Sequence, residues 1–127
     1  MSKKPSKSKS KKSVRTKKKK ATKLAIFLPP LTIRGRKSMI KVKALTDAGE
    51  PDTSRNDEIE LSINKESFMK FSNLSKNLKL KLVKGEVPAE VQTEEVNEVV
   101  ILKANWISGK SPLQSTVVTY IIGGLKH

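Results

Sequence analysis

The lysines and arginines near the N-terminus are the side chains of this sequence with the clearest chemical use. The first 23 residues hold 12 of them and no Asp or Glu. Each cation that neutralises a phosphate releases condensed counterions, so such a run binds polyanions without reading their sequence. No aromatic residue lies among them, which predicts contact with phosphates rather than with bases. The predicted nucleic-acid-binding residues are Lys3, Lys4, Lys7, Lys9, Lys11, Lys12, Arg15, Lys17, Lys18, Lys19, Lys20 and Lys23, followed by Arg34, Arg36 and Lys37.

This positive charge is confined to one part of the chain. The 127 residues include 27 Lys and Arg against 12 Asp and Glu, a net charge of +15, and the first acidic residue is Asp47. Residues 1 to 22 are rich in Lys and Ser and almost free of apolar side chains, so they cannot offset the entropy of ordering. We therefore expect a disordered basic arm over residues 1 to 22 and a folded domain over residues 23 to 127.

Several classes of catalytic site are excluded by composition. The sequence has no Cys, and its one His is the terminal His127. Thiolate metal sites, Cys nucleophiles and His-dependent triads are therefore ruled out. A cluster of acidic residues makes a Ca²⁺ site conceivable, but the EF-hand spacing is absent and Arg55 lies among them. We interpret the cluster as a solvated loop and expect no catalytic residue, metal or cofactor. Its members are Asp47, Glu50, Asp52, Asp57, Glu58 and Glu60.

The folded domain is predicted to consist of strands, because apolar and polar residues alternate in short runs. These strands position its charged side chains. About seven such runs separated by turn residues predict an all-β antiparallel sandwich. The stretch 64 to 77 is ambiguous, because Phe68, Phe71 and Leu74 are spaced by three and allow either a helical turn or a short strand. Trp106 is expected at a strand end that packs over the core. The clearest runs are 38 to 46, 57 to 63, 78 to 83, 87 to 91, 98 to 104 and 115 to 122.

Five segments together have a familiar pattern, and its most specific part is the turn Asp47-Ala48-Gly49-Glu50-Pro51 between two alternating strands. They are 21 to 33, 39 to 51, 57 to 63, 99 to 106 and 111 to 122. From about residue 23 to residue 123 the chain resembles the bacterial and archaeal immunoglobulin-like domains of the invasin/intimin class. The resemblance implies an Ig-like β-sandwich whose first hairpin contains this turn. That class occurs as tandem repeats in secreted adhesins, whereas this sequence has one copy and a basic arm. Adhesion does not follow, because a fold does not fix a function.

Lysines of the predicted domain form a second basic surface only if the strands that carry them lie in the same sheet. Lys41 and Lys43 are expected on the solvent face of one strand, and Lys79 and Lys81 on that of another. If the two strands share a sheet, the domain adds a basic face to the arm; ordinary solvated strand faces are the favoured interpretation.

The composition thus favours a non-enzymatic protein that binds the phosphate backbone of DNA or RNA through its arm, with the sandwich contacting protein partners or a second copy. A nucleoid, ribonucleoprotein or virion component fits this description. A cell-surface adhesion module and a viral capsid or assembly protein are the alternatives, and for the arm a solubility or targeting tail. No small-molecule substrate is expected, and the arm lacks the apolar face that membrane binding needs. The apolar run 24 to 33 is interrupted by Pro29-Pro30 and followed by Arg34, so an intracellular or virion location is expected rather than secretion.

Overall fold

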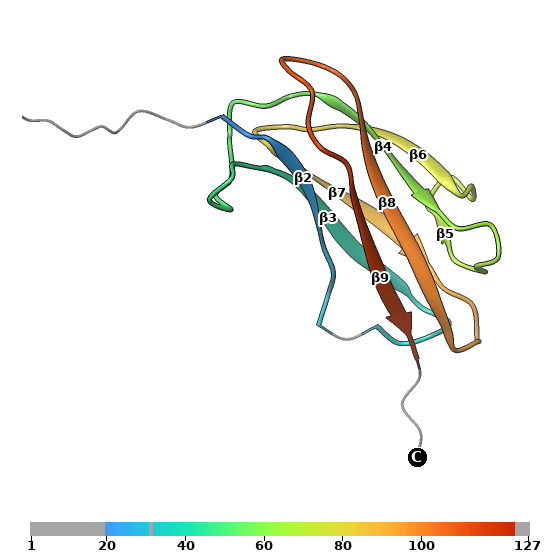
Figure 1. The fold of residues 1–127 in the computed structure, drawn as a ribbon. Helices are drawn as coiled ribbons and strands as arrows, with labels where there is room; N and C mark the ends of the chain where they lie inside the picture. Colours follow the sequence, from blue (N-terminus) through green and yellow to red (C-terminus); the bar gives the residue numbers. More distant parts are fainter. Residues whose placement is uncertain (1–19, 31, 124–127) are drawn as a thin grey trace, which may run out of the picture.

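A computed structural model describes residues 20 to 30 and 32 to 123. The prediction of a disordered arm lies outside the described residues, except at positions 20 to 22. Within the described part, the chain forms strands in two facing layers and no helix (Figure 1). The strands are β2 (Lys23–Phe27), β3 (Lys37–Leu45), β4 (Glu58–Ile63), β5 (Lys70–Phe71), β6 (Asn77–Lys81), β7 (Glu86–Gln92), β8 (Glu98–Ser108) and β9 (Thr116–Ile122).

The strands form two four-stranded antiparallel sheets. One sheet has the order β2-β3-β7-β5 and the other the order β6-β4-β8-β9. The chain therefore changes sheets at each of the five steps from β3 to β8, while β2 and β3 pair within one sheet and β8 and β9 form a hairpin in the other. A layer containing β2, β3 and β7 that faces a layer containing β4, β8 and β9 is the arrangement of Ig-like sandwiches. The predicted all-β, Ig-like sandwich is thus confirmed.

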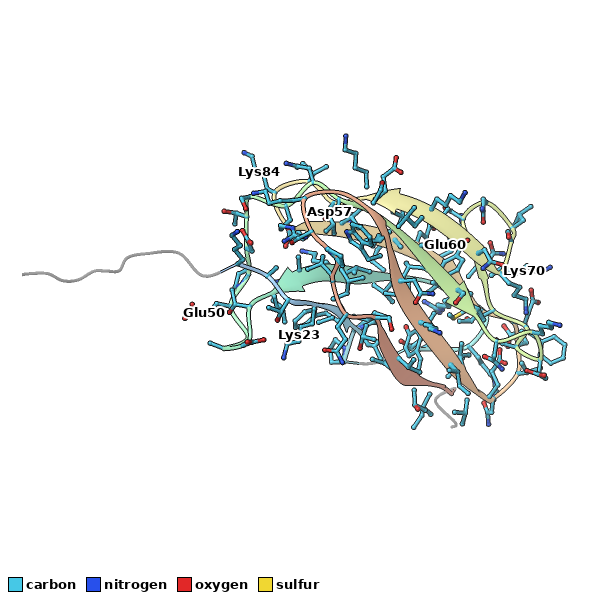
Figure 2. All side chains as sticks on the ribbon, turned by 45° about the horizontal axis from the view of Figure 1, so that its top comes forward. Lys23, Glu50, Asp57, Glu60, Lys70 and Lys84 are labelled. Carbon is cyan, nitrogen blue, oxygen red and sulfur yellow. The ribbon has the colours of Figure 1, made fainter. Side chains whose placement is uncertain are left out.

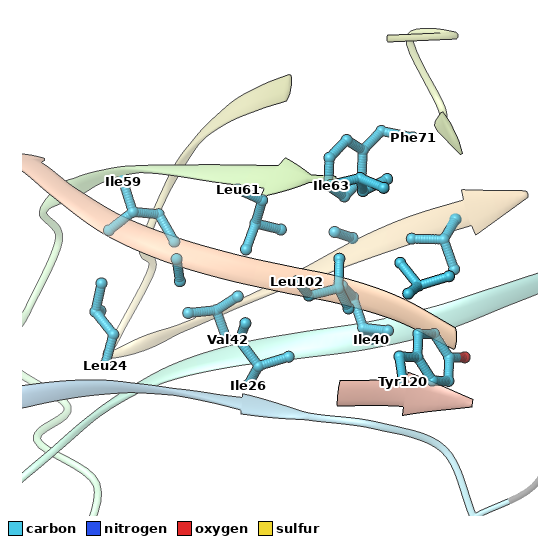
Figure 3. Packing of buried hydrophobic residues seen from close by; sticks show 14 of the residues in the cluster. Leu24, Ile26, Ile40, Val42, Ile59, Leu61, Ile63, Phe71, Leu102 and Tyr120 are labelled. Carbon is cyan, nitrogen blue, oxygen red and sulfur yellow. The ribbon is translucent and has the colours of Figure 1, made fainter. Parts of the chain in front are cut away.

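Alternation along each strand places the apolar side chains between the sheets. In β3, Ile40 and Val42 are at most 1% exposed, and in β4 and β8 Leu61 and Leu102 are fully buried. Figure 3 shows these side chains converging from both layers. Successive residues of a strand point to opposite faces, so a period of two puts one set into the core and the other into solvent. Each such buried side chain contributes about 1.5 to 3 kcal/mol to stability.

The turn that carries the family resemblance forms, but it does not close a hairpin. The amide of Gly49 donates to the carbonyl of Thr46 and that of Thr46 to the carbonyl of Glu50, at 2.9 and 2.8 Å, and Gly49 has φ +85°. The strands on either side, β3 and β4, lie in opposite sheets. The implied first hairpin is therefore wrong. Alternation identifies the buried face of each strand, but two such faces can meet either side by side or across the core.

The ambiguous stretch 64 to 77 contains a short strand and no helix. Phe71, in β5, is fully buried, whereas Phe68 is 56% and Leu74 is 69% exposed. Leu74 occupies a turn with φ +64°, and its amide donates to the carbonyl of Phe71 at 2.8 Å. The spacing of three among these side chains thus reflects a strand followed by a tight turn.

Candidate nucleic-acid interface

The segment that joins the basic arm to the sandwich is fixed by contacts to the loop after β3. The amide of Ala21 donates to Asp52 Oδ2 at 2.9 Å, and Thr22 Oγ1 donates to Asp47 Oδ1 at 2.6 Å. The amide of Thr22 donates to the carbonyl of Leu45 at 2.8 Å, and Ala21 is 3% exposed. Within the described residues, Ala21 and Thr22 thus already contact the sandwich, ahead of the predicted domain boundary at residue 23.

Hydrogen bonding lowers the pKa of Asp52, the residue that accepts from the amide of Ala21. Burial opposes ionisation of Asp52, but hydrogen bonds from the Ser54 hydroxyl and from the backbone of Ala21 outweigh it, and the pKa of Asp52 is held below its ordinary value. The carboxylate is therefore charged at neutral pH, directly beside the root of a polycationic segment.

The described members of the predicted binding set lie at two opposite ends of one sheet. Lys23 begins β2 and pairs with Leu45, the last residue of β3. Lys37 is the first residue of β3, about 26 Å away along that strand. Arg34 lies near the same far end, where its amide donates to the carbonyl of Gly123 at 2.8 Å. Figure 2 shows Lys23 and Glu50 at the same end of the sandwich. Arg34, Arg36 and Lys37 are thus not a continuation of the arm's charge.

Acidic or amide side chains accompany the cations at the far end. Arg34 donates from Nη1 to Asn97 Oδ1 at 2.7 Å, and its Nε lies 3.8 Å from Glu95 Oε1. Lys37 Nζ lies 3.7 Å from Glu90 Oε2. Such exposed pairs contribute little to stability, but they lower the local net charge that a polyanion meets. Lys20, directly before Ala21, is described and exposed. The remaining predicted residues, Lys3, Lys4, Lys7, Lys9, Lys11, Lys12, Arg15, Lys17, Lys18 and Lys19, lie outside the described residues.

The four strand lysines do not form a common basic face. Lys41 and Lys43 lie in the β2-β3-β7-β5 sheet, and their Nζ atoms are 3.6 and 3.9 Å from the carboxylate of Glu86. Lys79 and Lys81 lie in the other sheet, in β6, where their register partners in β4 are acidic: Glu60 and Glu58. Both outer faces therefore carry opposite charges in neighbouring strands.

A buried ion pair lies near the end of the sandwich from which the arm leaves. Arg55 is fully buried and Asp57 is 2% exposed. Arg55 donates from Nε to Asp57 Oδ1 and from Nη2 to Oδ2, both at 2.9 Å, which is a bidentate pair. Arg55 Nη1 donates to Ser111 Oγ at 3.0 Å, and Trp106 Nε1 donates to Asp57 Oδ2 at 2.8 Å. Burial opposes ionisation of Asp57, but the hydrogen bonds from Arg55 and Trp106 outweigh it and keep its pKa below the ordinary value.

This pair ties three connecting segments together. The carbonyl of Arg55 accepts from the amide of Gly85 at 2.8 Å, which fixes the β6–β7 turn. On the other side the β8–β9 turn lies so close to the carboxylate that a Cβ on Gly109 would collide with Asp57 Oδ2. The interpretation of the acidic cluster as a solvated loop is therefore wrong for Asp57. The signal in the sequence was the Arg two positions from an Asp that directly precedes an alternating strand.

Trp106 lies near the end of a strand and over the core, as predicted, and its indole also donates a hydrogen bond to Asp57. It packs against the core in the last part of β8 and remains partly exposed.

Within residues 20 to 30 and 32 to 123, no group of three or more His, Cys, Asp or Glu side chains is arranged to hold a metal ion. In the same part of the chain, no helix is present that would cross a membrane.

Comparison with known proteins identifies the fold and no family. No family model and no curated protein matches the chain. Among solved structures, a β-glucuronidase from glycoside hydrolase family 2 aligns with TM-score 0.65 and 16% identity over 87% of this chain. A family 2 glycosyl hydrolase from Bacteroides cellulosilyticus aligns with TM-score 0.63 and 13% identity over 81%, and a Parabacteroides merdae β-glucuronidase with 0.58 and 12% over 94%.

These matches concern a small part of much longer enzymes. This chain spans 12%, 14% and 13% of the length of the three proteins. At such low identity the likeness shows a shared all-β, Ig-like sandwich alone, since one fold supports many functions.

Proposed function

We propose that this protein is a non-enzymatic, nucleic-acid-associated protein. Its arm, residues 1 to 22, together with Lys23, binds the phosphate backbone of DNA or RNA irrespective of sequence. The sandwich serves as a protein-contact or docking module. The proposed setting is intracellular or in a virion, as a nucleoid, ribonucleoprotein or virion component. The observation that carries this proposal is the contrast between 12 cations without an acid in the first 23 residues and a body in which acids accompany the cations.

The body itself is a weak candidate for the main binding surface. Lys41 and Lys43 share one glutamate, and Arg34 and Lys37 each lie within 4 Å of another. A polyanion approaching either sheet therefore meets both signs of charge, whereas along the arm it meets one. Counterion release depends on the number of phosphates neutralised, so the arm is expected to supply most of the affinity.

The absence of enzymatic activity is part of the same proposal. Asp57 is the most buried carboxylate of the described residues, and its two oxygens already accept hydrogen bonds from Arg55 and Trp106. A carboxylate engaged in this way stabilises the fold and is poorly placed to transfer protons. Glycoside hydrolysis, the activity of the larger proteins with similar domains, is not proposed here.

The test is a salt titration of binding to random-sequence duplex DNA and to a structured RNA. The full chain is compared with a variant lacking residues 2 to 19, which removes ten cations and keeps Ala21 and its contacts. For six or more phosphate contacts, the affinity of the full chain should fall by about 10³ or more between roughly 50 and 200 mM salt. The deletion should bind weakly and with a shallow salt dependence, at an unchanged melting temperature.

A second variant compares the contribution of the arm's cations to binding with that of the cations in the sandwich. Replacing Arg34, Arg36 and Lys37 with Gln removes three cations at the far end and should change affinity by less than about tenfold. If the full chain does not bind either nucleic acid at about 150 mM salt, the proposal fails. A preference for the RNA would narrow it to a ribonucleoprotein.

A second proposal rests on the turn between Asp47 and Pro51. The turn forms, with its own hydrogen bonds and a positive φ at Gly49, and this supports the resemblance to invasin/intimin-type domains even though the turn joins strands of opposite sheets. Under this proposal the sandwich is a cell-surface adhesion module, and the arm has another role. Failure of nucleic-acid binding together with recovery of the protein at the cell surface would favour it.

A further inference from the structure

Two aromatic side chains of the described residues are largely exposed, and they have opposite charges beside them. Phe27, at the end of β2, is 45% exposed, and Phe68, in the loop before β5, is 56% exposed. The backbone amide of Phe68 donates to both carboxylate oxygens of Glu98, each at 3.2 Å, so an acid contacts this residue. By contrast, Lys43 Nζ lies 4.9 Å from the centroid of the Phe27 ring. Phe27 is thus presented to solvent together with a cation.

The alternation of β2 places the Phe27 ring on the outer face of its sheet, on the strand that follows the arm. Leu24 and Ile26 point into the core (Figure 3), so the other residues of β2 point outward. These are Lys23, Ala25 and Phe27. Phe27 lies about 13 Å from Lys23 along the strand. The outer side of β2 therefore leads from the last cation of the N-terminal run to an exposed aromatic ring.

The neighbouring strand β3 supplies cations to the same outer face. Lys43 is the register partner of Ala25, and Lys41 is that of Phe27. Because Ala25 has a small side chain, Lys43 reaches diagonally across the pair to the ring and makes a cation–π contact. Met39, two positions from Lys41 on this face, is 55% exposed. The two strands together thus present lysines beside an aromatic ring and an apolar side chain.

The acids of this face lie one strand further from Phe27. Glu86 and Glu90 belong to β7, which is on the other side of β3 from β2. In the β3–β7 register, Glu86 lies opposite Lys43 and Glu90 lies opposite Met39. Neither β2 nor β3 contains an acidic residue. The half of the face that β2 and β3 form is therefore basic and apolar, and the half that β7 forms carries the acids.

We propose that the outer face of β2 and β3 binds the unpaired bases of a single-stranded nucleic acid, with a base stacked on Phe27. The inference rests on the proposed function and adds to it a preference for single strands over duplex. Unpaired bases stack on exposed aromatic side chains, and every base has a π-face, so the contact does not depend on sequence. In a duplex the bases are stacked on one another, and the ring gains no such contact.

Charge and continuity with the arm select a nucleic-acid strand as the occupant. A second copy of this face would set lysines against lysines, whereas the phosphates of a strand complement Lys23, Lys41 and Lys43. The face also begins where the run of 12 cations ends, so a strand bound by the arm is held at a high effective concentration beside Phe27. Because Lys41 and Lys43 also contact Glu86, their phosphate contacts add little, and stacking supplies the preference for single strands.

Fluorescence anisotropy of the full chain with a labelled oligo(dT) strand, and with a blunt-ended duplex of the same length, tests this proposal. Phe27→Leu keeps an apolar side chain and removes the π-face. It should lower the affinity for the single strand at least about fivefold. The affinity for the duplex and the slope of log affinity against log salt should stay as in the wild type, because the phosphate contacts are retained. An oligo(U) strand in the same assay compares RNA with DNA.

Phe68→Leu is the matched control, because Phe68 is similarly exposed but has Glu98 beside it. It should bind both nucleic acids as the wild type does. Direct contact is measured by tryptophan emission: the single strand should quench the added fluorophore in Phe27→Trp and leave that in Phe68→Trp unchanged. Melting temperatures near that of the wild type show that the variants are folded.

Two results would overturn the proposal while the proposed function stands. One is a Phe27→Leu variant that binds the single strand as tightly as the wild type, which would leave this face to a protein partner. The other is an equal loss of affinity for the single strand and the duplex, which would assign Phe27 to the phosphate contacts. A wild-type chain that binds neither nucleic acid would instead remove the proposed function and this inference together.

Discussion

The arm and the sandwich contain the same kinds of cation in opposite electrostatic settings. In the arm, lysines follow one another without an acid, because all 12 acidic residues lie at or beyond Asp47. In the sandwich, Lys41 and Lys43 flank Glu86, and the most buried cation, Arg55, is held by Asp57 at 2.9 Å through two parallel hydrogen bonds. The position of the acids, rather than the number of lysines, therefore distinguishes the unbalanced charge of the N-terminal segment from the matched charge of the sandwich.

The largest effect is expected from the arm. Replacing six of its lysines with Gln should lower the slope of log affinity against log salt by about five, since each phosphate contact contributes about 0.9. The same six replaced with Arg should retain the slope, because the charge is conserved. Filter binding or fluorescence anisotropy at several salt concentrations measures both. Equal slopes for the Gln and Arg variants would contradict the proposed division of charge. The six positions are Lys3, Lys4, Lys7, Lys9, Lys11 and Lys12.

The buried pair should give the largest effect on stability. Asp57→Asn leaves the guanidinium of Arg55 buried without a counter-charge, which is expected to cost about 3 to 5 kcal/mol. Glu50→Gln removes an exposed carboxylate at the same end and should change stability by less than about 0.5 kcal/mol. Urea unfolding followed by tryptophan fluorescence or circular dichroism measures the difference. A loss below 1 kcal/mol for Asp57→Asn would mean that the pair is not important for the fold.

Trp106 connects the pair to the core and should come next in size. Trp106→Ala removes both the ring and the donor to Asp57 and should cost about 3 kcal/mol. Trp106→Phe keeps most of the apolar contact and loses the hydrogen bond to a charged acceptor, for an expected cost of about 1.5 kcal/mol. Unfolding followed by far-ultraviolet circular dichroism avoids the missing fluorophore. Equal losses in the two variants would assign the whole effect to the hydrogen bond.

The pH dependence of stability should be the smallest and most specific effect. The pKa of Asp57 is lower in the folded protein than its ordinary value of 3.8. Its contribution to stability is therefore fully present above that value and is lost as pH falls through the lower, folded pKa. The difference in stability between wild type and Asp57→Asn should thus be constant from about pH 7 to 5 and shrink under more acidic conditions. A difference that already shrinks between pH 7 and 5 would contradict this assignment.

Much of the fold was predictable because burial follows directly from alternation. The inward residues of β3, β4 and β8 were identified from the sequence, and Ile40, Leu61 and Leu102 are buried as expected. Strand pairing was not predictable in the same way. Lys79 and Lys81 show the same alternation as Lys41 and Lys43, yet the two pairs lie in different sheets, because a local period contains no information about which neighbours a strand takes.

For the candidate interface, too, some features followed from the sequence and others required the structure. The arm was recognised from composition alone, since charge density is a property of the sequence. The positions of Arg34, Arg36 and Lys37 at the far end of the sheet depend on the direction of β2 and β3 and required the structure. The buried role of Asp57 also required it, because a carboxylate in a polar loop looks solvated until its partner is seen.

By itself the sequence determined that the charge is segregated, that there is no Cys and a single His, and that the body is an antiparallel sandwich with a defined set of buried residues. The tertiary structure decided which strands are neighbours and which charges are matched. The physical reason is the distance along the chain over which each effect acts. Alternation, composition and turn chemistry act over a few residues, whereas Arg55 meets Ser111 through a contact between segments far apart in the chain.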